Sequence, residues 1–275
     1  MMTLDILICT IGEGIRNVPD MLLAPRNDVR YVVSWQVDNP SAEQFSFLTA
    51  AFSARKDIRV YTLEGKGLSR NRNNAMKYAE SDICLIADDD CKYTDSQIDN
   101  IINTYGKAEG TDLICFEANT SDGTPIKKYP NESMEYTKAV HSGYYPSSFE
   151  ISFRRSTVVG KIKFNELFGL GSEQLNCGEE SVFLHDALRK GLSAVFVPDV
   201  ICTTPAGTTG TRFLSDIKVQ RSKGAVFRYV YGRFGGLWHC LKEVCHHTVF
   251  NHSNPLFLLK NMLYGYNYCN SNIQP

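Results

Sequence analysis

Three adjacent aspartates, Asp88, Asp89 and Asp90, directly follow the apolar run "DICLIA" (82–87), which is typical of a buried strand. Adjacent carboxylates repel one another, and each must be solvated, paired or bound to a cation. In open α/β sheets, ligands bind outside the carboxyl ends of the strands, and Mg²⁺ takes one or two carboxylates together with substrate phosphates. We therefore expect a divalent-cation site at this point. The alternative is a solvated turn that caps the next helix.

Two arginines, Arg70 and Arg72, lie just before this strand in the predicted first turn of a helix that begins at Ser69 as N-cap. The helix macrodipole disfavours a cation there by about 0.3–1 kcal/mol. A phosphate would compensate, because a helix N-terminus supplies backbone donors and arginine supplies bidentate donors. The alternative is that both side chains point into water. An anion site and a cation site beside one strand together favour a metal-bound diphosphate.

The elements that must position these residues alternate between strand and helix in the N-terminal half, which predicts a largely parallel sheet covered by helices. Thr10 and Asp38 then fall at the carboxyl ends of the first two strands. Helices are expected from Ser69, after Asp95 and over 180–191, and beyond 213. Strands are expected over 4–10, 29–37, 58–64, 82–87, 112–118, 148–155 and 192–200.

The segment "GLSRNRNNAMKYAESDICLIADDDCKY" (67–93) resembles family 2 glycosyltransferases of the GT-A fold. Sequences of that family run approximately G-x-S-x-A-R-N-x-A here, followed by a strand and an Asp-rich DxD motif. The later segments "SFEISFRRSTVVG", "FNELFGLG" and "GEESVFLHDALRKGLSAVFVPD" are similar to the family's acceptor side, where a G-E-D motif opens a helix. The last 60 or so residues show no such resemblance.

The resemblance implies an α/β fold of the GT-A type, a Rossmann-like, mostly parallel (mixed) sheet flanked by helices. It places a GT-A glycosyltransferase domain over residues 1–215, with a nucleotide-binding half (1–110) and an acceptor half (111–215). Residues 216–275 would then form a C-terminal helical extension rich in basic and aromatic side chains.

The resemblance also implies a bound Mn²⁺ or Mg²⁺. Asp88 and Asp90 match the outer positions of the DxD motif, which contact ribose and metal, and Asp89 lies between them. A histidine that commonly ligates the metal in the family would fall near Thr204, where this chain has a hydroxyl. The remaining nucleotide-sugar contacts, from the resemblance and from the helix-terminus argument, are Thr10, Asp38, Arg70, Arg72 and Asn73.

Glu179 and Glu180 match the E-D of the acceptor motif, with Glu180 at the position of the general base. Transfer of a sugar with inversion needs a carboxylate beside the acceptor hydroxyl, and a general base contributes about 10²–10⁴-fold. Acids in the first turn of a helix also stabilise that helix through the macrodipole. This structural role is the alternative for both glutamates.

Charge is distributed unevenly along the 275 residues. The net charge is −1, but from Lys218 onwards seven Lys and Arg face a single acid, Glu243, which gives +6 together with ten aromatic residues. Such a tail suits binding to an anionic membrane surface. The alternatives are a helical cap that packs on the core and an oligomer interface. Nucleic acid is not an expected partner. Nine irregularly spaced cysteines and the lack of an apolar run of about 20 residues predict a cytoplasmic protein, at most peripheral on the inner face of the membrane.

Together, these residues and the family resemblance predict a metal-dependent, inverting, hexosyltransferase-type glycosyltransferase. It would move a sugar from a nucleoside diphosphate sugar to a glycan or lipid-linked acceptor. Bacterial surface polysaccharide synthesis is the usual setting for similar sequences. One alternative is a nucleotidyltransferase, although the segment "TIGEGIRN" after the first strand lacks the lysine of such enzymes. A second alternative is a non-catalytic nucleotide- or carbohydrate-binding protein on the same scaffold.

Overall fold

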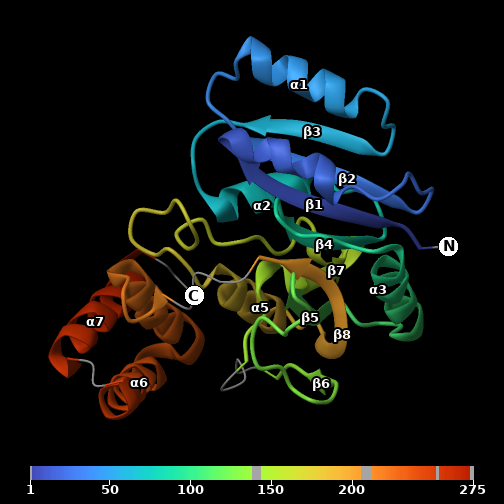
Figure 1. Cartoon of the computed structure of the whole chain (residues 1–275). Coiled ribbons are helices and arrows are strands. Elements are labelled where there is room, and N and C mark those ends of the chain that lie inside the picture. The colour runs from blue at the N-terminus through green and yellow to red at the C-terminus, as the bar shows by residue number, and fades with distance from the viewer. Residues whose placement is uncertain (1, 138–143, 206–211, 252–253, 273–275) are drawn as a thin grey trace.

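The computed structural model describes residues 2–137, 144–205, 212–251 and 254–272, and in them one mixed sheet has the strand order β3-β2-β1-β4-β7-β5-β8-β6 (Figure 1). The expected α/β architecture is confirmed. The strands are β1 (Leu4–Ile11), β2 (Val29–Gln36), β3 (Ile58–Leu63), β4 (Ile83–Asp88), β5 (Leu113–Thr120), β6 (Met134–Glu135), β7 (Ile151–Arg154) and β8 (Ala194–Thr204).

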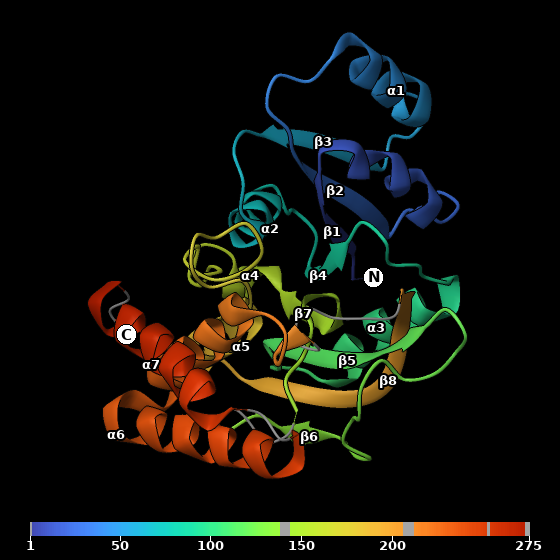
Figure 2. The ribbon, with the colours of Figure 1, turned by 60° about the vertical axis from the view of Figure 1, so that its left-hand side comes forward.

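Both faces of the sheet are covered by helices, so its central strands are apolar on both sides. In β1, Leu4, Ile6 and Ile8 enter one buried cluster, whereas Leu7 and Cys9 enter the other. Side chains of η1 (Gly12–Met21), α1 (Ala42–Phe52) and α3 (Asp95–Lys107) fill the first cluster. Side chains of α2 (Leu68–Lys77), α4 (Arg155–Val158) and α5 (Glu179–Arg189) fill the second. In Figure 2 these three helices lie on the side of the sheet opposite α3.

The register of the parallel strands brings the polar strand ends to one edge of the sheet. β1 pairs in parallel with β2 and β4, with Thr10 opposite Trp35 and Cys9 opposite Asp88. The direction changes at β7, which is antiparallel to β4 and β5. Because β1 and β4 end together, the residues that follow them are neighbours in space.

Three local expectations differ from the structure. Ser69 is not the N-cap of α2, because the helix begins at Leu68 and the Ser69 hydroxyl donates to the carbonyl of Phe168 at 2.7 Å. The first part of the strand expected over 148–155 is a 3-10 turn, η2 (Ser148–Glu150). The sequence pattern also did not predict α1, which buries only Phe52.

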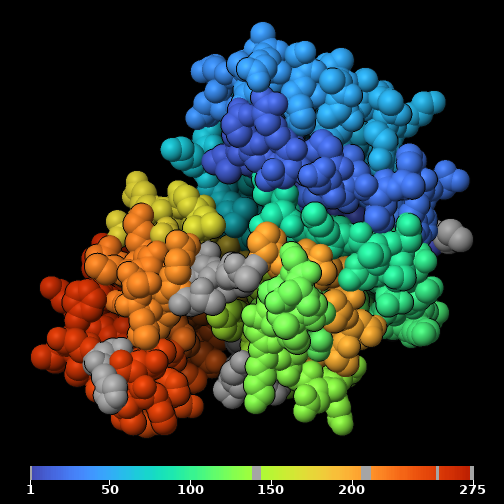
Figure 3. Space-filling view, in the orientation of Figure 1, coloured from blue at the N-terminus to red at the C-terminus, as the bar shows by residue number. Residues whose placement is uncertain are grey.

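The C-terminal region is helical, with α6 (Ile217–Asn251) and α7 (Pro255–Asn272) forming a lobe beside the sheet (Figure 3, orange to red). Gly232 breaks α6, because its φ of 71° is outside the helical range. The two halves turn back on each other, so that Lys223 pairs with Glu243 and the rings of Phe227 and His239 lie 5.4 Å apart. No helix within the described ranges is long and apolar enough to span a membrane.

Two glycines allow α6 and α7 to cross in direct backbone contact. A Cβ added to Gly265 would lie 1.8 Å from the carbonyl oxygen of Arg221, and one added to Gly224 would lie 1.9 Å from that of Met262. Neither oxygen is at the end of a flexible side chain, so a larger residue would separate the helices.

We expect Gly265→Ala to lower the free energy of unfolding by about 1–3 kcal/mol, the usual cost of overpacking. Gly106→Ala is the matched control, because Gly106 lies within α3 and its added Cβ would meet only the Met2 side chain, at 3.6 Å. That control should be neutral or slightly stabilising. Denaturant unfolding of both variants checks the prediction, and equal stability of the two would contradict the proposed close crossing.

Candidate functional site

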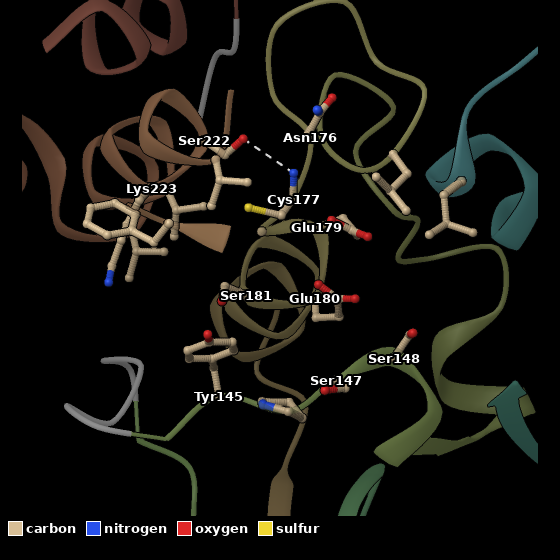
Figure 4. Close-up of a pocket in the computed structure, with 18 of the residues that line it drawn as sticks. Tyr145, Ser147, Ser148, Asn176, Cys177, Glu179, Glu180, Ser181, Ser222 and Lys223 are labelled. Carbon is tan, nitrogen blue, oxygen red and sulfur yellow. Dashed lines mark hydrogen bonds between the residues drawn. The ribbon is translucent and has the colours of Figure 1, made fainter. Parts of the chain in front are cut away.

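A cavity of about 670 Å³ lies between the carboxyl end of β4, the first turn of α5 and the wall formed by α6. Asp88, Asp90, Arg72, Glu179 and Glu180 all line it. Figure 4 shows both glutamates at the start of α5, with Glu179 on one side of Glu180 and the loop that carries Ser147 and Ser148 on the other. The structure therefore brings the predicted metal ligands and the predicted base to one cavity.

Arg72 is the centre of the site, with only 1% of its side chain exposed. Its Nη1 donates to Glu179 at 2.8 Å and to Glu180 at 3.4 Å, while its Nη2 donates to the Ser148 hydroxyl at 2.6 Å and to Asp88 at 3.3 Å. Burial alone would lower the pKa of the guanidinium, but the charges of Asp88, Glu180 and Glu179 outweigh this effect and raise the pKa above its ordinary range. Arg72 is thus a permanent cation that joins α2, β4 and α5.

Gly178 fixes where α5 begins. It is the N-cap residue with φ 94°, a left-handed conformation that glycine adopts without strain. A Cβ at Gly178 would also lie 2.4 Å from Cγ2 of Val226 on α6. Because the helix starts at this residue, Glu179 and Glu180 occupy its first turn and approach Arg72 together.

The two glutamates differ in exposure and in their contacts. Glu179 is 5% exposed and held by Arg72, whereas Glu180 is 17% exposed and makes the longer contact to the same guanidinium. Burial, together with the charge of Glu179, raises the pKa of Glu180 to about 8, although Arg72 acts in the opposite direction. A carboxyl group with this pKa and this position can exchange a proton with a ligand in the cavity near neutral pH.

The aspartate triplet divides between two directions. Asp88 and Asp90 line the cavity, while Asp89 accepts a hydrogen bond from the hydroxyl of Thr10 at the end of β1. Burial raises the pKa of Asp90, and the charges of Asp88 and Asp89 raise it further. Two crowded, partly desolvated carboxylates are a donor set that a divalent cation stabilises.

These carboxylates fit a metal site that a ligand completes. No group of three or more His, Cys, Asp or Glu side chains in the described part of the chain is arranged to hold a metal by itself. Thr204, near the position of the family's histidine, is buried and lines the cavity beside Asp90, whereas residues 206–211 lie outside the described ranges. Mg²⁺ and Mn²⁺ take such incomplete protein sites when phosphate oxygens supply further ligands.

Asp38 and Arg70 lie on a neighbouring rim at the carboxyl ends of β2 and β3. Asp38 accepts from the backbone N–H of Gly65 at 2.7 Å, and Arg70 donates to the carbonyl of Glu64 at 2.7 Å. Both side chains are exposed or partly exposed and bind the same short loop, 64–65. They are near each other but do not line the cavity.

The structure places Asn73 elsewhere. Its side-chain amide donates to the carbonyl of Phe164 at 2.9 Å and accepts from the N–H of the same residue at 2.8 Å. These bonds hold the chain segment that precedes α5, and Asn73 does not line the cavity. Its contact with a nucleotide stays a prediction.

Sequence reasoning missed Ser148, Tyr145 and the α6 wall. The bond between Ser148 and Arg72 joins residues 76 positions apart, and no local pattern signals it. The α6 wall includes Val226 and Tyr231, which line the cavity. Their helical spacing was available in the sequence, but it does not reveal which element the helix packs against.

Residues 35–163 match the family model described as "Glycosyl transferase family 2". No curated protein matches the chain. Among solved structures, S. aureus TarS 1–349 superposes with a TM-score of 0.59 at 13% identity, covering 98% of this chain and 92% of that chain. The present chain spans only 44% of a longer TarS chain, at 16% identity over 90% of its own length and a TM-score of 0.58.

A third similar structure is the mannosyltransferase PcManGT from Pyrobaculum calidifontis in complex with GDP-Man and Mn²⁺, with a TM-score of 0.57 at 14% identity, covering 100% of this chain and 76% of that chain. Identities this low show a shared fold, which is the GT-A fold. The segment that matches the family model contains Arg72 and the three aspartates of the cavity. Over residues 35–163 the chain therefore matches family 2 glycosyltransferases, and as a whole it has the GT-A fold.

Proposed function

We propose that the protein is a metal-dependent, inverting glycosyltransferase that moves a hexosyl group from a nucleoside diphosphate sugar to a hydroxyl of a glycan or lipid-linked acceptor, in bacterial surface polysaccharide synthesis. One observation supports this most directly. A single cavity presents the Glu180 carboxyl group and, on another side, the pair Asp88 and Asp90. Inverting transfer needs a base beside the attacking hydroxyl and a charge-stabilising site beside the departing diphosphate, on opposite faces of the anomeric carbon.

On the donor side, Asp88 and Asp90 would hold the divalent cation, whose role when bound is to neutralise charge on the departing diphosphate. Similar folds are known in complex with UDP, with UDP-GlcNAc, and with GDP-Man and Mn²⁺, which supports a nucleotide-sugar donor for this chain. The nucleotide contacts we propose come from the strand ends, α2 and the triplet. They are Thr10, Asp38, Arg70, Arg72, Asn73, Asp88 and Asp89.

On the acceptor side, Glu180 would accept the proton of the attacking hydroxyl. Glu179 has a different role in this proposal, because its shorter contact to Arg72 holds the guanidinium in place. Arg72 in turn keeps Asp88 and the first turn of α5 at a fixed separation. These different contacts support Glu180 over Glu179 as the proposed base.

The proposed domain division keeps the boundaries expected from the sequence. We propose a GT-A domain over 1–215, with a nucleotide-binding half over 1–110 and an acceptor half over 111–215, and an extension over 216–275. Since α6 contributes Val226, Phe227 and Tyr231 to the cavity, the extension would take part in acceptor binding. A cytoplasmic location, peripheral on the inner face of the membrane, belongs to the same proposal.

The two rival functions remain distinguishable. A nucleotidyltransferase would need a lysine-bearing, glycine-rich loop after β1, whereas the chain forms η1 there, with no lysine between residues 12 and 21. In a non-catalytic binding protein on this scaffold, ligand binding would not depend on the ionisation of Glu180, and no sugar would be transferred.

We expect Glu180→Gln to lower kcat about 10²–10⁴-fold while the affinity for the sugar nucleotide is retained, because the amide keeps the shape of the side chain but accepts no proton. Glu135→Gln, an exposed glutamate on β6, is the matched control and should leave both quantities unchanged. Steady-state transfer and equilibrium donor binding measure the two effects. Full turnover by the Glu180 variant would show that the base is misassigned, whereas absence of transfer by the wild-type protein would favour the non-catalytic alternative.

The pH dependence of the reaction should report the same residue. Because the pKa of Glu180 is raised to about 8, most of this group is protonated at pH 7 in the free protein. A base acts only when deprotonated, so kcat/KM should rise with pH and level off above about 8. Activity would be lost as pH falls through that value. A pH profile that is flat between 6 and 9 would contradict the assignment.

We expect Asp90→Ala to abolish the Mn²⁺-dependent part of sugar-nucleotide binding, since it removes one of the two aspartates that line the cavity. Thermal unfolding in the presence of the sugar nucleotide, with and without Mn²⁺, measures this, because a ligand that binds only the folded state raises Tm. Asp199→Ala, an acid on β8 outside the cavity, is the control and should keep the Mn²⁺ response. An unchanged Mn²⁺-dependent Tm shift in the Asp90 variant would exclude this residue as a ligand.

A further inference from the structure

The second half of α6, residues 233–251, is apolar on the side that faces solvent. Phe234 is 83% exposed and Trp238 66%, and Leu237 and Leu241 are 39% and 40% exposed. These positions have the spacing i, i+3, i+4 and i+7, which places them on one face of the helix. The opposite face of the same half buries Gly236, Cys240 and Val244.

The same face continues to the end of the helix through Cys245, which is exposed, and Val249, which is 66% exposed. We call it the outer face of α6, made of Phe234, Leu237, Trp238, Leu241, Cys245 and Val249. None of its members is charged, whereas a helix at the surface of a soluble domain normally turns its polar side to water. Phe250 at the end of α6 and Leu256 and Phe257 at the start of α7 are also at least 50% exposed. Contiguous exposed apolar surface of this kind marks an interaction site.

The charge around this face is positive. From Lys218 onwards the net charge is +6, and the sole acid, Glu243, is paired with Lys223 and lies 3.0 Å from a ring nitrogen of His247. Arg233 and Lys242 are exposed beside the face. The first 217 residues carry −7, so positive charge is concentrated in the C-terminal segment to which the outer face belongs. The complementary partner is therefore both apolar and anionic.

An anionic lipid surface has both properties. Amphipathic helices with Trp, Phe and Leu on one side and basic residues beside them lie in the plane of the membrane interface. A second copy of this chain fits less well, because a two-fold contact through the outer face would set two segments of charge +6 against each other. A second copy of the chain is therefore the alternative occupant, and the experiment below tests for it.

We propose that the outer face of α6 binds an anionic membrane surface, with the second half of α6 lying in the interface and Phe234 and Trp238 inserted among the lipid headgroups. His239, Lys242 and Glu243 of the same half line the catalytic cavity, so this orientation brings the cavity to the membrane. It deepens the proposed function by selecting a lipid-linked acceptor. Binding to the surface itself does not depend on the proposed reaction.

Sedimentation with vesicles tests this without sugar nucleotide or turnover. Wild-type protein should partition onto vesicles of phosphatidylglycerol and phosphatidylcholine and much less onto phosphatidylcholine alone. The double variant Phe234→Ser, Trp238→Ser should bind at least tenfold more weakly, since two large aromatic anchors are removed. Arg233→Gln should weaken binding about fivefold, the effect of one basic residue near an anionic surface. Phe45→Ser, which removes a 52% exposed aromatic residue on α1, is the matched control and should bind as wild type does.

Three results would overturn the proposal: equal binding to the two kinds of vesicle, wild-type binding by the double variant, or a wild-type dimer that Trp238→Ser converts to a monomer. The last would assign the outer face to a second copy of the chain. Each variant is first compared with wild type by thermal unfolding, and Arg233→Gln keeps the test valid if the double variant is unstable. Glu180→Gln should bind vesicles normally, so a failure of the catalytic assignment is separable from a failure of this one.

Discussion

The buried guanidinium of Arg72 is the interaction on which the site depends. One cation is enclosed by carboxylates from β4 and α5, and its Nη2 also donates to the hydroxyl of Ser148. Removing one partner of a buried ion pair typically costs about 3–5 kcal/mol, because the other charge stays desolvated. The arrangement therefore fixes the distance between the strand end that would hold a metal and the helix that would supply the base. A lysine could not replace Arg72, since its ammonium lacks the fork that contacts three elements at once.

The opposite wall of the cavity depends on glycines. Gly178 lets α5 start against α6, Gly232 turns α6 back on itself, and Gly224 and Gly265 bring α6 and α7 into backbone contact. These positions share no sequence motif with the donor side. Arg72 and the three aspartates lie within the segment that matches the family model, whereas the α6 wall lies beyond that segment.

Much of the candidate site could be predicted from the sequence, because its signals are local. An apolar run followed by aspartates indicates a strand end, and "GEES" after a loop indicates the first turn of a helix; both are present. The position of Asn73 and the bond of Ser148 to Arg72 could not be predicted, since they depend on contacts between residues 76 to 91 apart in the chain. Ser69 was misread for the same reason. A serine near a helix start favours an N-cap by its local propensity, but here its hydroxyl bonds to Phe168.

Charge crowding links the two chemical roles of the cavity. Arg72 supplies one positive charge near four acids, Asp88, Asp90, Glu179 and Glu180, so full ionisation would leave an excess of negative charge in a partly desolvated space. Burial disfavours the charged form of Glu180 and the charge of Glu179 adds to this effect, so the pKa of Glu180 is raised to about 8 although Arg72 acts in the opposite direction. The excess of negative charge also favours a cation between the two aspartates. Proton uptake by Glu180 and cation binding by Asp88 and Asp90 would both relieve this crowding, and Arg72 holds the first turn of α5 beside the end of β4.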